Sequence, residues 1–441
     1  MDWQGRTAAA LGVAIGEGRL DPLELAEAVL AAIRESAHGG RIYARPTEER
    51  ALAEAGAARE RARAGLRRGP LDGVPLSWKD LFDTAGVATE SGSRMFRGRV
   101  PERDAAVLGV ATAGGSVCLG KTHMSEFAFS GLGFNPMAET PPNVNDHDAV
   151  PGGSSSGAAA SVAFGLAPAA IGSDTGGSVR TPAAWNDLVG LKTTHGRLSN
   201  DGVVPLCETL DTVGPLTRTV EDAALVLALL EGGPPADLEG ATLAGARLAV
   251  LETVAMEGLE DAPGRAFESA LDRLAQAGAQ VTRIGAPLVT EVMEVSAPLY
   301  ATEAYAIWRE RLEAEPGVLF GEIEKRILAG RDTPAHVWIH AWREVRRHRA
   351  AWGALVAGFD AVVCPTVQIL PPKVDEIAEG GEVYVRRNLQ ALRNTRIFNL
   401  LGGAGLTVPT GAPSCGILIS GPPLSEGRLL RLGAAAERAL S

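Results

Sequence analysis

The residues best suited to chemistry lie in two glycine-serine clusters between Pro151 and Arg180. The first cluster reads GGSSSG and the second reads SDTGGSVR, and Ser154 and Ser178 within them are 24 positions apart. Glycines beside a serine let several backbone N–H groups turn toward one point, because no Cβ blocks them. Such a nest can hold the developing oxyanion of an acyl transfer while the serine hydroxyl attacks. A turn that only connects a strand to a helix is the alternative interpretation.

The first cluster also matches the G-x-S-x-G nucleophile elbow, with Ser155 at its centre. That motif requires an acid and a histidine downstream, and His195, His336, His340 and His348 do follow it. The elbow normally follows a strand, whereas the preceding residues, PPNVNDHDAVPGG, are typical of a loop, so we interpret the match as accidental. His336 and His340 stand four apart, but HVWIH lacks the glutamate of a zinc motif and a third ligand. We therefore expect no metal site there.

Lys79, at the end of the apolar run GVPLSWK, is a candidate for the base that would activate a serine. A free lysine has a pKa of about 10.4 and is charged near neutral pH, so it cannot accept a proton there. Burial would have to lower that pKa by several units, at a cost of about 1.4 kcal/mol per unit. The alternative is a strand-end lysine that reaches solvent and pairs with Asp80. Without further context, the residues favour this alternative.

Several elements are expected around these residues. Asp21 and Pro22 begin a helix that continues through LELAEAVLAAI, and a second helix is expected over about 47–68. From residue 70 onward, short apolar segments punctuated by glycine alternate with helical stretches, which indicates an α/β layer structure. Thr219 is the expected cap of another helix, and the part from about 295 to 360 is helix-rich. FDAVVCPT is typical of a buried strand.

The composition excludes several classes of function. A chain of 441 residues that is 46% apolar can bury a large core, and its net charge of −11 with scattered basic residues argues against nucleic-acid binding. Its four cysteines lie far apart, which favours a reducing cytoplasm. The apolar run 8–15 resembles a short signal-peptide core, but it lacks a small-residue cleavage site and is better interpreted as a first helix. The long uncharged stretch 154–173 contains Pro168 and many small residues, so we expect no membrane span.

Taken together, the motifs resemble those of the amidase signature enzymes. The matching pieces occur in order as GPLDGVPLSWKD, GKTHMSEFAFSG, VPGGSSSG, IGSDTGGSVRTPAAW, GLKTTHGRLS and ETLDTVGPLTRTVEDAA. They cover roughly residues 70–225 densely, and FDAVVCPT and LTVPTGAP resemble later elements of the family. The resemblance implies an α/β fold with a mixed sheet of about eleven strands and helices on both faces. It also implies that no metal or organic cofactor is needed.

The resemblance further implies a catalytic triad, because Lys79, Ser154 and Ser178 occupy the matching motif positions. Ser178 would attack the carbonyl carbon, and Ser154 would pass its proton to neutral Lys79. The remaining site residues follow from the same motifs: the backbone of Thr175, Gly176, Gly177 and Ser178 for the oxyanion hole, Ser155, Asp174 and Arg180 for the shape of the site, and Ala128 for the acyl pocket. We expect one domain over residues 1–441, with an N-terminal helical part (about 1–69), a signature core (about 70–225) and a helix-rich substrate-pocket part (about 290–360).

Two functions compete under this resemblance. The first is a hydrolase that acts alone on a small-molecule amide and releases ammonia or an amine, as a monomer or a homodimer. The second is a glutaminase-like component of an amidotransferase, which needs a partner protein. Relatives of the second type carry tyrosines in a downstream glutamine-site segment, and GRDTPAHVWIHAWREVRRHR has none, so we favour the hydrolase. An inactive scaffold is disfavoured because all triad positions are filled. Specificity depends on residues from about 290 to 400 that the sequence cannot place.

Overall fold

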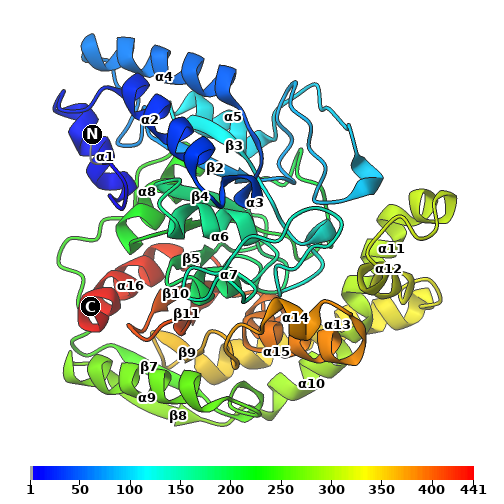
Figure 1. The fold of residues 1–441 in the computed structure, drawn as a ribbon. Coiled ribbons are helices and arrows are strands. Elements are labelled where there is room, and N and C mark those ends of the chain that lie inside the picture. Colours follow the sequence, from blue (N-terminus) through cyan, green and yellow to red (C-terminus); the bar gives the residue numbers. More distant parts are fainter. Residues whose placement is uncertain (1–2) are drawn as a thin grey trace.

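The short apolar segments of the sequence form the strands of a single mixed sheet in the computed structural model, which describes residues 3–441 (Figure 1). Over these residues the sheet has eleven strands in the order β1-β3-β2-β4-β6-β5-β10-β11-β9-β7-β8. Their bounds are β1 Tyr43–Pro46, β2 Pro75–Lys79, β3 Val117–Thr122, β4 Ala169–Ser173, β5 Val189–Lys192, β6 Val213–Thr217, β7 Arg247–Leu251, β8 Gln280–Ile284, β9 Ala361–Pro365, β10 Ala404–Pro409 and β11 Gly416–Gly421. The predicted mixed sheet of about eleven strands is thus confirmed.

The sheet contains two parallel groups. Strand β2 is parallel to both β3 and β4, and β7 is parallel to both β8 and β9. Antiparallel pairs through β6, β5, β10 and β11 join these groups. Every residue of β2, β3 and β4 is buried, and apart from Lys79 and Lys121 these segments consist mainly of apolar and small residues. Parallel strands covered on both faces show this pattern instead of alternation.

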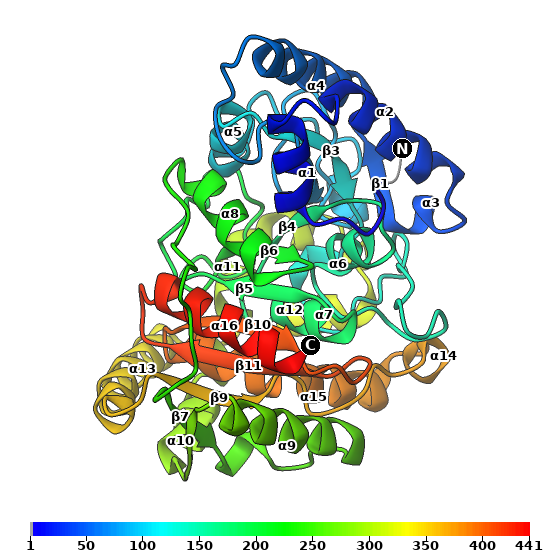
Figure 2. The same ribbon diagram turned by 90° about the vertical axis from the view of Figure 1, so that its left-hand side faces the viewer.

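Helices cover both faces of the sheet, as expected. Helices α8, α9 and α16 pack on one face and lie in front of the sheet in Figure 2, whereas α6, α7 and α15 pack on the other. The helices are α1 Ala8–Gly16, α2 Pro22–Glu35, α3 Gly39–Ile42, α4 Glu48–Arg63, α5 Ala106–Ala113, α6 Ser156–Ala163, α7 Arg180–Trp185, α8 Val220–Glu231, α9 Asp261–Gln276, α10 Pro287–Val295, α11 Ala297–Ala314, α12 Gly321–Leu328, α13 Ala335–Val356, α14 Val374–Ile377, α15 Gly381–Leu400 and α16 Glu426–Leu440. Single 3₁₀ turns are η1 Arg94–Phe96, η2 Glu126–Ala128 and η3 Thr253–Ala255.

The helix caps follow the signals in the sequence. The Asp21 side chain accepts hydrogen bonds from the first turn of α2, and the Thr219 side chain accepts one from the Asp222 N–H of α8. The helix predicted over 47–68 ends earlier, at Arg63, because Gly65 follows with a φ of +69° that no helix continues. Local capping chemistry therefore fixes the starts of these helices, and a glycine fixes the end of α4.

The apolar run near the N-terminus forms helix α1, as predicted. The N–H groups of Ala8 and Ala9 donate to the Asp222 carboxylate at 3.1 and 2.8 Å, which ties α1 to α8. Among residues 3–441, no helix combines the length and the apolar character needed to cross a bilayer. The helix-rich part follows strand β8, and its helices α11 and α12 project away from the sheet on the right of Figure 1.

Candidate active site

The site begins where two parallel strands end side by side. Lys79 is the last residue of β2 and Ser173 is the last residue of β4, and the register pairs Trp78 with Ile171. Parallel strands bring their carboxyl ends to the same edge of a sheet, where α/β proteins build their sites. The lysine and this serine are therefore neighbours, although 94 positions separate them in the chain.

Lys79 is fully buried and contacts hydroxyl groups instead of a carboxylate. Its Nζ atom donates to Ser154 Oγ at 2.6 Å and to Ser173 Oγ at 2.8 Å. Over residues 3–441, no carboxylate oxygen lies within ion-pair distance of Lys79; the neighbouring Asp80 pairs with Lys121 at 3.2 Å. The interpretation of Lys79 as a surface lysine paired with Asp80 is therefore wrong, because β2 is covered on both faces.

The environment of Lys79 favours its neutral form. Burial lowers the pKa of Lys79 to about 7, and the nearby Asp174 and Asp211 charges oppose part of this effect. Desolvation penalises the ammonium ion because the apolar surroundings replace its hydration shell. Near pH 7 a large share of Lys79 is then unprotonated and able to accept a proton.

The first glycine-serine cluster leads into helix α6. Ser154 and Ser155 precede this helix, and the Ser155 N–H donates to the Ser178 carbonyl at 3.1 Å. Ser155 Oγ donates to the Ser173 carbonyl at 3.2 Å, so this hydroxyl joins the cluster to the end of β4. No strand leads into Ser155, which agrees with the interpretation of its G-x-S-x-G match as accidental. Ser155 thus holds together the two segments that carry Ser154 and Ser178.

The second cluster forms a tight loop between β4 and α7. Gly177 adopts a φ of +134°, and a Cβ built on it would come within 2.0 Å of Thr395 Oγ1, so only glycine fits. Across the described chain, the backbone N–H groups of Thr175, Gly176 and Ser178 donate to no protein acceptor. The Gly177 N–H differs, because it donates to Asp174 Oδ1 at 2.9 Å. The loop therefore offers three free N–H groups, not four, for an oxyanion.

A buried ion pair fixes this loop. Asp174 and Arg180 are both fully buried, and Arg180 Nε and Nη2 donate to the two Asp174 carboxylate oxygens at 2.9 Å each. Burial alone would raise the pKa of Asp174, but the Arg180 charge and its hydrogen bonds hold that pKa well below its usual range. Helix α15 completes the arrangement, because Asn399 Nδ2 donates to Asp174 Oδ1 at 2.9 Å and Thr395 Oγ1 donates to the Gly176 carbonyl at 2.8 Å.

A second carboxylate lies under the same loop. Thr175 Oγ1 donates to Asp211 Oδ1 at 2.5 Å, and the N–H groups of Leu206 and Cys207 donate to Asp211 Oδ2. Burial raises the pKa of Asp211 to about 6. The sequence contained a signal for this residue, since Asp211 lies in the quoted segment ETLDTVGPLTRTVEDAA.

The pocket next to Ser178 has about 310 Å³ of empty space, part of which is open to solvent. It is lined by residues from six segments of the chain: Ala128, Phe129, Ser130, Thr175, Gly176, Ser178, Leu206, Tyr300, Arg326, Leu392 and Arg396. Ala128, predicted for the acyl pocket, is one of these lining residues. Tyr300, Arg326 and Arg396 come from α11, α12 and α15, and sequence reasoning missed them because they are 96 residues apart at the extremes and share no motif.

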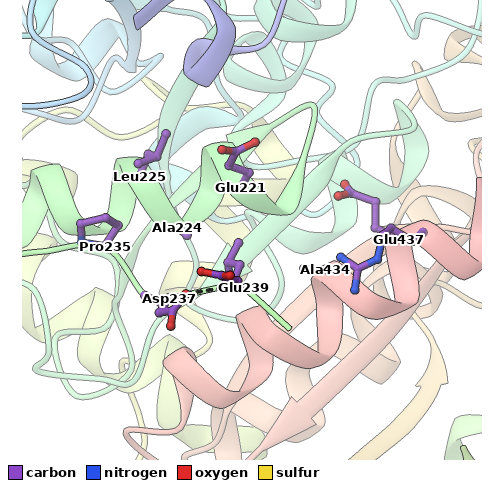
Figure 3. Close-up of a pocket in the computed structure, with 11 residues that line it drawn as sticks. Glu221, Ala224, Leu225, Pro235, Asp237, Glu239, Ala434 and Glu437 are labelled. Carbon is purple, nitrogen blue, oxygen red and sulfur yellow. Dashed lines mark hydrogen bonds between the residues drawn. The ribbon is translucent and has the colours of Figure 1, made fainter. Parts of the chain in front are cut away.

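Other clefts and histidines lie apart from this site. A second pocket, of about 1090 Å³, is lined from α8, α16 and the segment between α8 and β7 by four carboxylates, Arg438 and apolar side chains (Figure 3). Its lining contains no hydroxyl or lysine that could act as nucleophile or base. His195, His336 and His340 are exposed and do not line the pocket of Ser178. Within residues 3–441, no group of three or more histidine, cysteine, aspartate or glutamate side chains is arranged to hold a metal ion.

Comparison with known proteins gives a consistent result. The model of the amidase family matches residues 24–430. A 2-amino-5-chloromuconic acid deaminase of Comamonas testosteroni is 36% identical over 377 residues, which cover 83% of this chain and 81% of the relative. A component of the glutamyl-tRNA(Gln) amidotransferase of Chloroflexus aggregans is 33% identical, and the match covers 98% of this chain and 96% of the relative. A crystal structure of an amidase superposes with a TM-score of 0.90 at 31% identity, covering 99% of this chain and 100% of its own.

Proposed function

This chain belongs to the amidase signature family and is a hydrolase of carbon–nitrogen bonds other than peptide bonds. From this premise we propose that it cleaves a small-molecule amide through an acyl-enzyme on Ser178. The observation that carries the proposal is the environment of Lys79. It is fully buried, contacts Ser154 Oγ and Ser173 Oγ, and has a pKa lowered to about 7 by burial. A neutral amine beside a hydroxyl chain is a general base.

In the proposed acylation step, the Ser178 hydroxyl attacks the amide carbonyl carbon. The proton passes from Ser178 to Ser154, and from Ser154 to Lys79, whose Nζ lies 2.6 Å from Ser154 Oγ. Ser178 Oγ makes no hydrogen bond to another described side chain, so the proposed relay requires the bond from Ser178 to Ser154 to form in the substrate complex. Catalytic hydrogen bonds often tighten only in the substrate complex.

The loop that carries Ser178 supports the charge that develops in this step. The free N–H groups of Thr175, Gly176 and Ser178 would donate to the oxyanion, whereas the Gly177 N–H stays with Asp174. Because the buried pair of Asp174 and Arg180 fixes these groups before the reaction, they need little reorganisation. One such donor is worth about 3–4 kcal/mol of transition-state stabilisation in a well-studied protease.

The same relay running backward would complete the reaction. The ammonium of Lys79 returns a proton through Ser154 to the leaving nitrogen, the C–N bond breaks, and ammonia or an amine departs. Water then attacks the Ser178 ester and gives a proton to the relay; the bond between the acyl carbon and Ser178 Oγ breaks, the relay returns the proton to Ser178 Oγ, and the carboxylic acid departs. All bonds and protons balance with water as the only co-substrate.

The direct test is ammonia release by the purified chain over a panel of aliphatic, aromatic and urea-type primary amides plus glutamine. We expect release with at least one amide and none with Ser178→Ala. Equal release by Ser178→Ala would contradict the proposal. A folded wild-type chain that releases neither ammonia from primary amides nor an amine from secondary amides would also contradict it, unless a partner protein restores release.

The relative from Chloroflexus aggregans supports a second candidate, a glutaminase-like component of an amidotransferase, because the match extends over 98% of this chain. The lack of tyrosine in segment 330–349 counts less against this candidate than expected. That segment contributes nothing to the pocket of Ser178, whereas Tyr300 from α11 does line it. Glutamine hydrolysis that requires a co-purified partner would favour this candidate, and release by the chain alone, as a monomer or homodimer, would favour the hydrolase.

We also propose that the protein works in a reducing compartment such as the cytoplasm. Its four cysteines are buried and free, and none pairs with another. An oxidising compartment usually selects disulfides in exported proteins. Fractionation of cells that express the protein would test this proposal, and recovery from the exported fraction would contradict it.

A further inference from the structure

Two arginines in the pocket of Ser178 lack an ionic partner. Over residues 3–441, neither Arg326 nor Arg396 lies within 4.0 Å of a carboxylate oxygen, although the chain forms many ion pairs elsewhere. Arg326 Nη1 donates to the Phe129 carbonyl at 2.7 Å, and its guanidinium lies 4.1 Å over the Phe129 ring. Arg396 Nε is buried and has no hydrogen-bond partner among the described residues. The pocket thus contains one guanidinium held in place and one with unused donors.

Two cations without counter-charges are costly at this depth. The pKa of Arg326 is lowered to about 10, mainly by burial, and the Arg396 charge acts in the same direction. Burial also lowers the pKa of Arg396, and Arg393 adds to this effect. Arginine nevertheless stays charged near neutral pH, and a partly buried charge that has no ionic partner destabilises the fold. Such an arrangement persists in a binding site when the ligand supplies the opposite charge.

A third donor points to the same place. Tyr300 Oη is buried and has no hydrogen-bond partner within residues 3–441. A Cβ built on Gly176 would lie 4.0 Å from Tyr300 Oη and 4.0 Å from Arg396 Cγ, so both side chains stand over the loop that would hold the oxyanion. No carboxylate lines this pocket, and its remaining walls include the apolar side chains of Ala128, Leu206 and Leu392. The unused donors therefore surround a small space beside the reacting carbonyl.

We propose that Arg396, Arg326 and Tyr300 form a carboxylate subsite, so that the substrate is a short amide bearing a carboxylate and no ammonium group. A guanidinium binds a carboxylate through two parallel hydrogen bonds, and the tyrosine hydroxyl adds a third donor. The short distance from this subsite to the Gly176 loop limits the spacer between amide and carboxylate to a few atoms. An ammonium group would find two cations and no carboxylate in the lining of this pocket. This inference rests on the proposed function and names its substrate class.

Matched substrates test the inference. The series malonamate, succinamate and glutaramate differs from propanamide, butanamide and pentanamide only in carrying a carboxylate where the others carry a methyl group. We expect kcat/KM for the best anionic amide to exceed that of its neutral match by on the order of 100-fold. Glutamine, which adds an ammonium group to glutaramate, should be a poorer substrate than glutaramate. Equal kcat/KM within each matched pair would overturn the inference and leave the proposed function intact.

Substitutions locate the subsite. Arg396→Met should reduce the ratio between anionic and neutral amides by on the order of 100-fold, mainly through KM, and Arg326→Met should also reduce it. Arg396→Lys should restore part of the ratio. Arg386→Met is the matched control, because Arg386 lies on the same helix, is exposed, and does not line the pocket. It should leave the ratio unchanged, and a ratio unchanged in Arg396→Met would contradict the assignment.

Binding measured without turnover separates the two proposals. Titration of Ser178→Ala with succinate by calorimetry should show a single site, and the additional Arg396→Met change should weaken it on the order of 100-fold. Without succinate, the melting temperature of Arg396→Met should not fall below that of the parent, because the change removes a partly buried charge that has no ionic partner. Succinate that binds equally well without Arg396 would overturn the inference. Succinate binding by a chain that hydrolyses no amide would support the subsite while the proposed function fails.

Discussion

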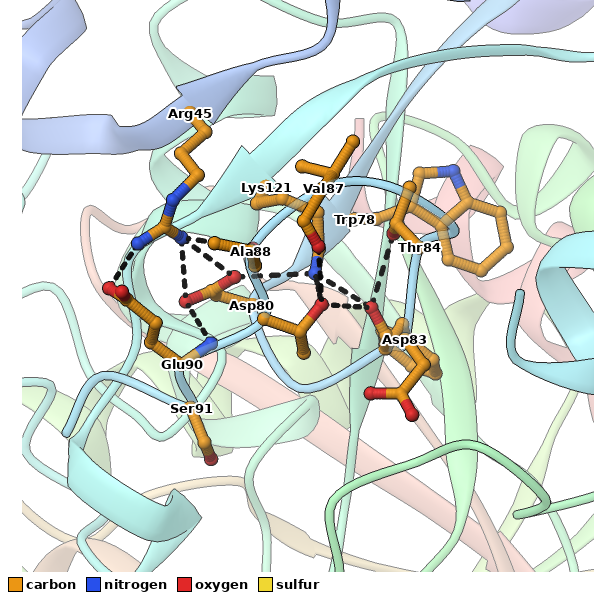
Figure 4. Close-up of polar contacts among 12 residues, drawn as sticks. Arg45, Trp78, Asp80, Asp83, Thr84, Val87, Ala88, Glu90, Ser91 and Lys121 are labelled. Carbon is orange, nitrogen blue, oxygen red and sulfur yellow. Dashed lines mark hydrogen bonds and ion pairs between the residues drawn. The ribbon is translucent and has the colours of Figure 1, made fainter. Parts of the chain in front are cut away.

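Two lysines are fully buried on adjacent strands of the sheet, and their surroundings differ. Lys79 ends β2 and contacts Ser154 Oγ and Ser173 Oγ. Lys121 on β3 pairs with Asp80 Oδ1 at 3.2 Å and donates to the Phe82 carbonyl at 2.7 Å. Figure 4 shows Arg45 on the other side of the Asp80 carboxylate and beside Glu90. Both lysines are equally removed from water, so their partners decide what each can do.

One sheet thus holds a structural lysine and a reactive lysine on adjacent strands, and their different partners account for the difference. Burial lowers the pKa of each lysine, but the adjacent Asp80 carboxylate raises that of Lys121 and favours its ammonium form. The more remote charges of Asp174 and Asp211 oppose burial less effectively at Lys79, whose pKa is about 7. A lysine with a carboxylate partner holds loops together, whereas a lysine with hydroxyl partners can exchange protons with them.

The largest expected effect is on turnover. Lys79→Met should lower kcat by a factor on the order of 10³–10⁴, because the relay loses its proton acceptor. Lys121→Met should leave the kcat of the folded fraction within a few-fold of wild type. Steady-state ammonia release, normalised to folded protein by circular dichroism, measures both. Similar losses in the two variants would break the comparison.

For the free energy of unfolding, we expect the larger change in Lys121→Met and the smaller change in Lys79→Met. Lys121→Met leaves Asp80 with only Arg45 as an ionic partner and should lower the free energy of unfolding by about 3 kcal/mol. Lys79→Met should keep or increase stability at pH 8. Between pH 7 and 10.5 the unfolded state binds more protons at residue 79 than the native state does, so the wild-type lysine destabilises the fold there. Urea denaturation of both variants tests this expectation, and a greater loss in Lys79→Met would contradict it.

The pH dependence of kcat/KM tests whether neutral Lys79 acts as the base. Because Lys79 must be neutral to accept a proton, kcat/KM should rise tenfold per unit below about pH 7 and level off above it. Lys192 could also be the group whose titration causes this rise, since burial lowers its pKa to about 7 as well. Its Nζ, however, donates only to the Thr193 carbonyl. A rate that is flat between pH 5 and 8 would exclude both lysines as the titrating group.

Two charge-removing variants show which of these two lysines causes the pH dependence. Their expected effect on kcat/KM is the smallest of those described. Asp211 raises the pKa of Lys79, so Asp211→Asn should move the acid limb of the profile, the rise of kcat/KM below about pH 7, to lower pH by up to about one unit. Glu426 raises the pKa of Lys192, so Glu426→Gln should leave the limb in place. The reverse pattern would assign the limb to Lys192 and remove Lys79 from the mechanism.

The motifs predicted the core of the site because strand ends and tight glycine turns are local features. The run GVPLSWK placed Lys79 at a strand end, and the fixed loop around Gly177 followed from its two glycines. The sequence could not show that the Gly177 N–H is occupied by Asp174, since that bond depends on the loop conformation. It also could not place Tyr300, Arg326 and Arg396, because three helices must pack together before these side chains meet. The sequence thus predicted the features that depend on neighbouring residues, but not the lining of the substrate pocket.

The most direct test of Ser178 as the nucleophile and Lys79 as its base is covalent labelling with a fluorophosphonate reagent, followed by peptide mapping. We predict one label on the peptide that contains Ser178, a labelling rate that falls below about pH 7, and no labelling in Lys79→Met, whereas Lys121→Met still reacts. A label on Ser154 or Ser155 in place of Ser178, or labelling that is unchanged in Lys79→Met, would contradict this mechanism.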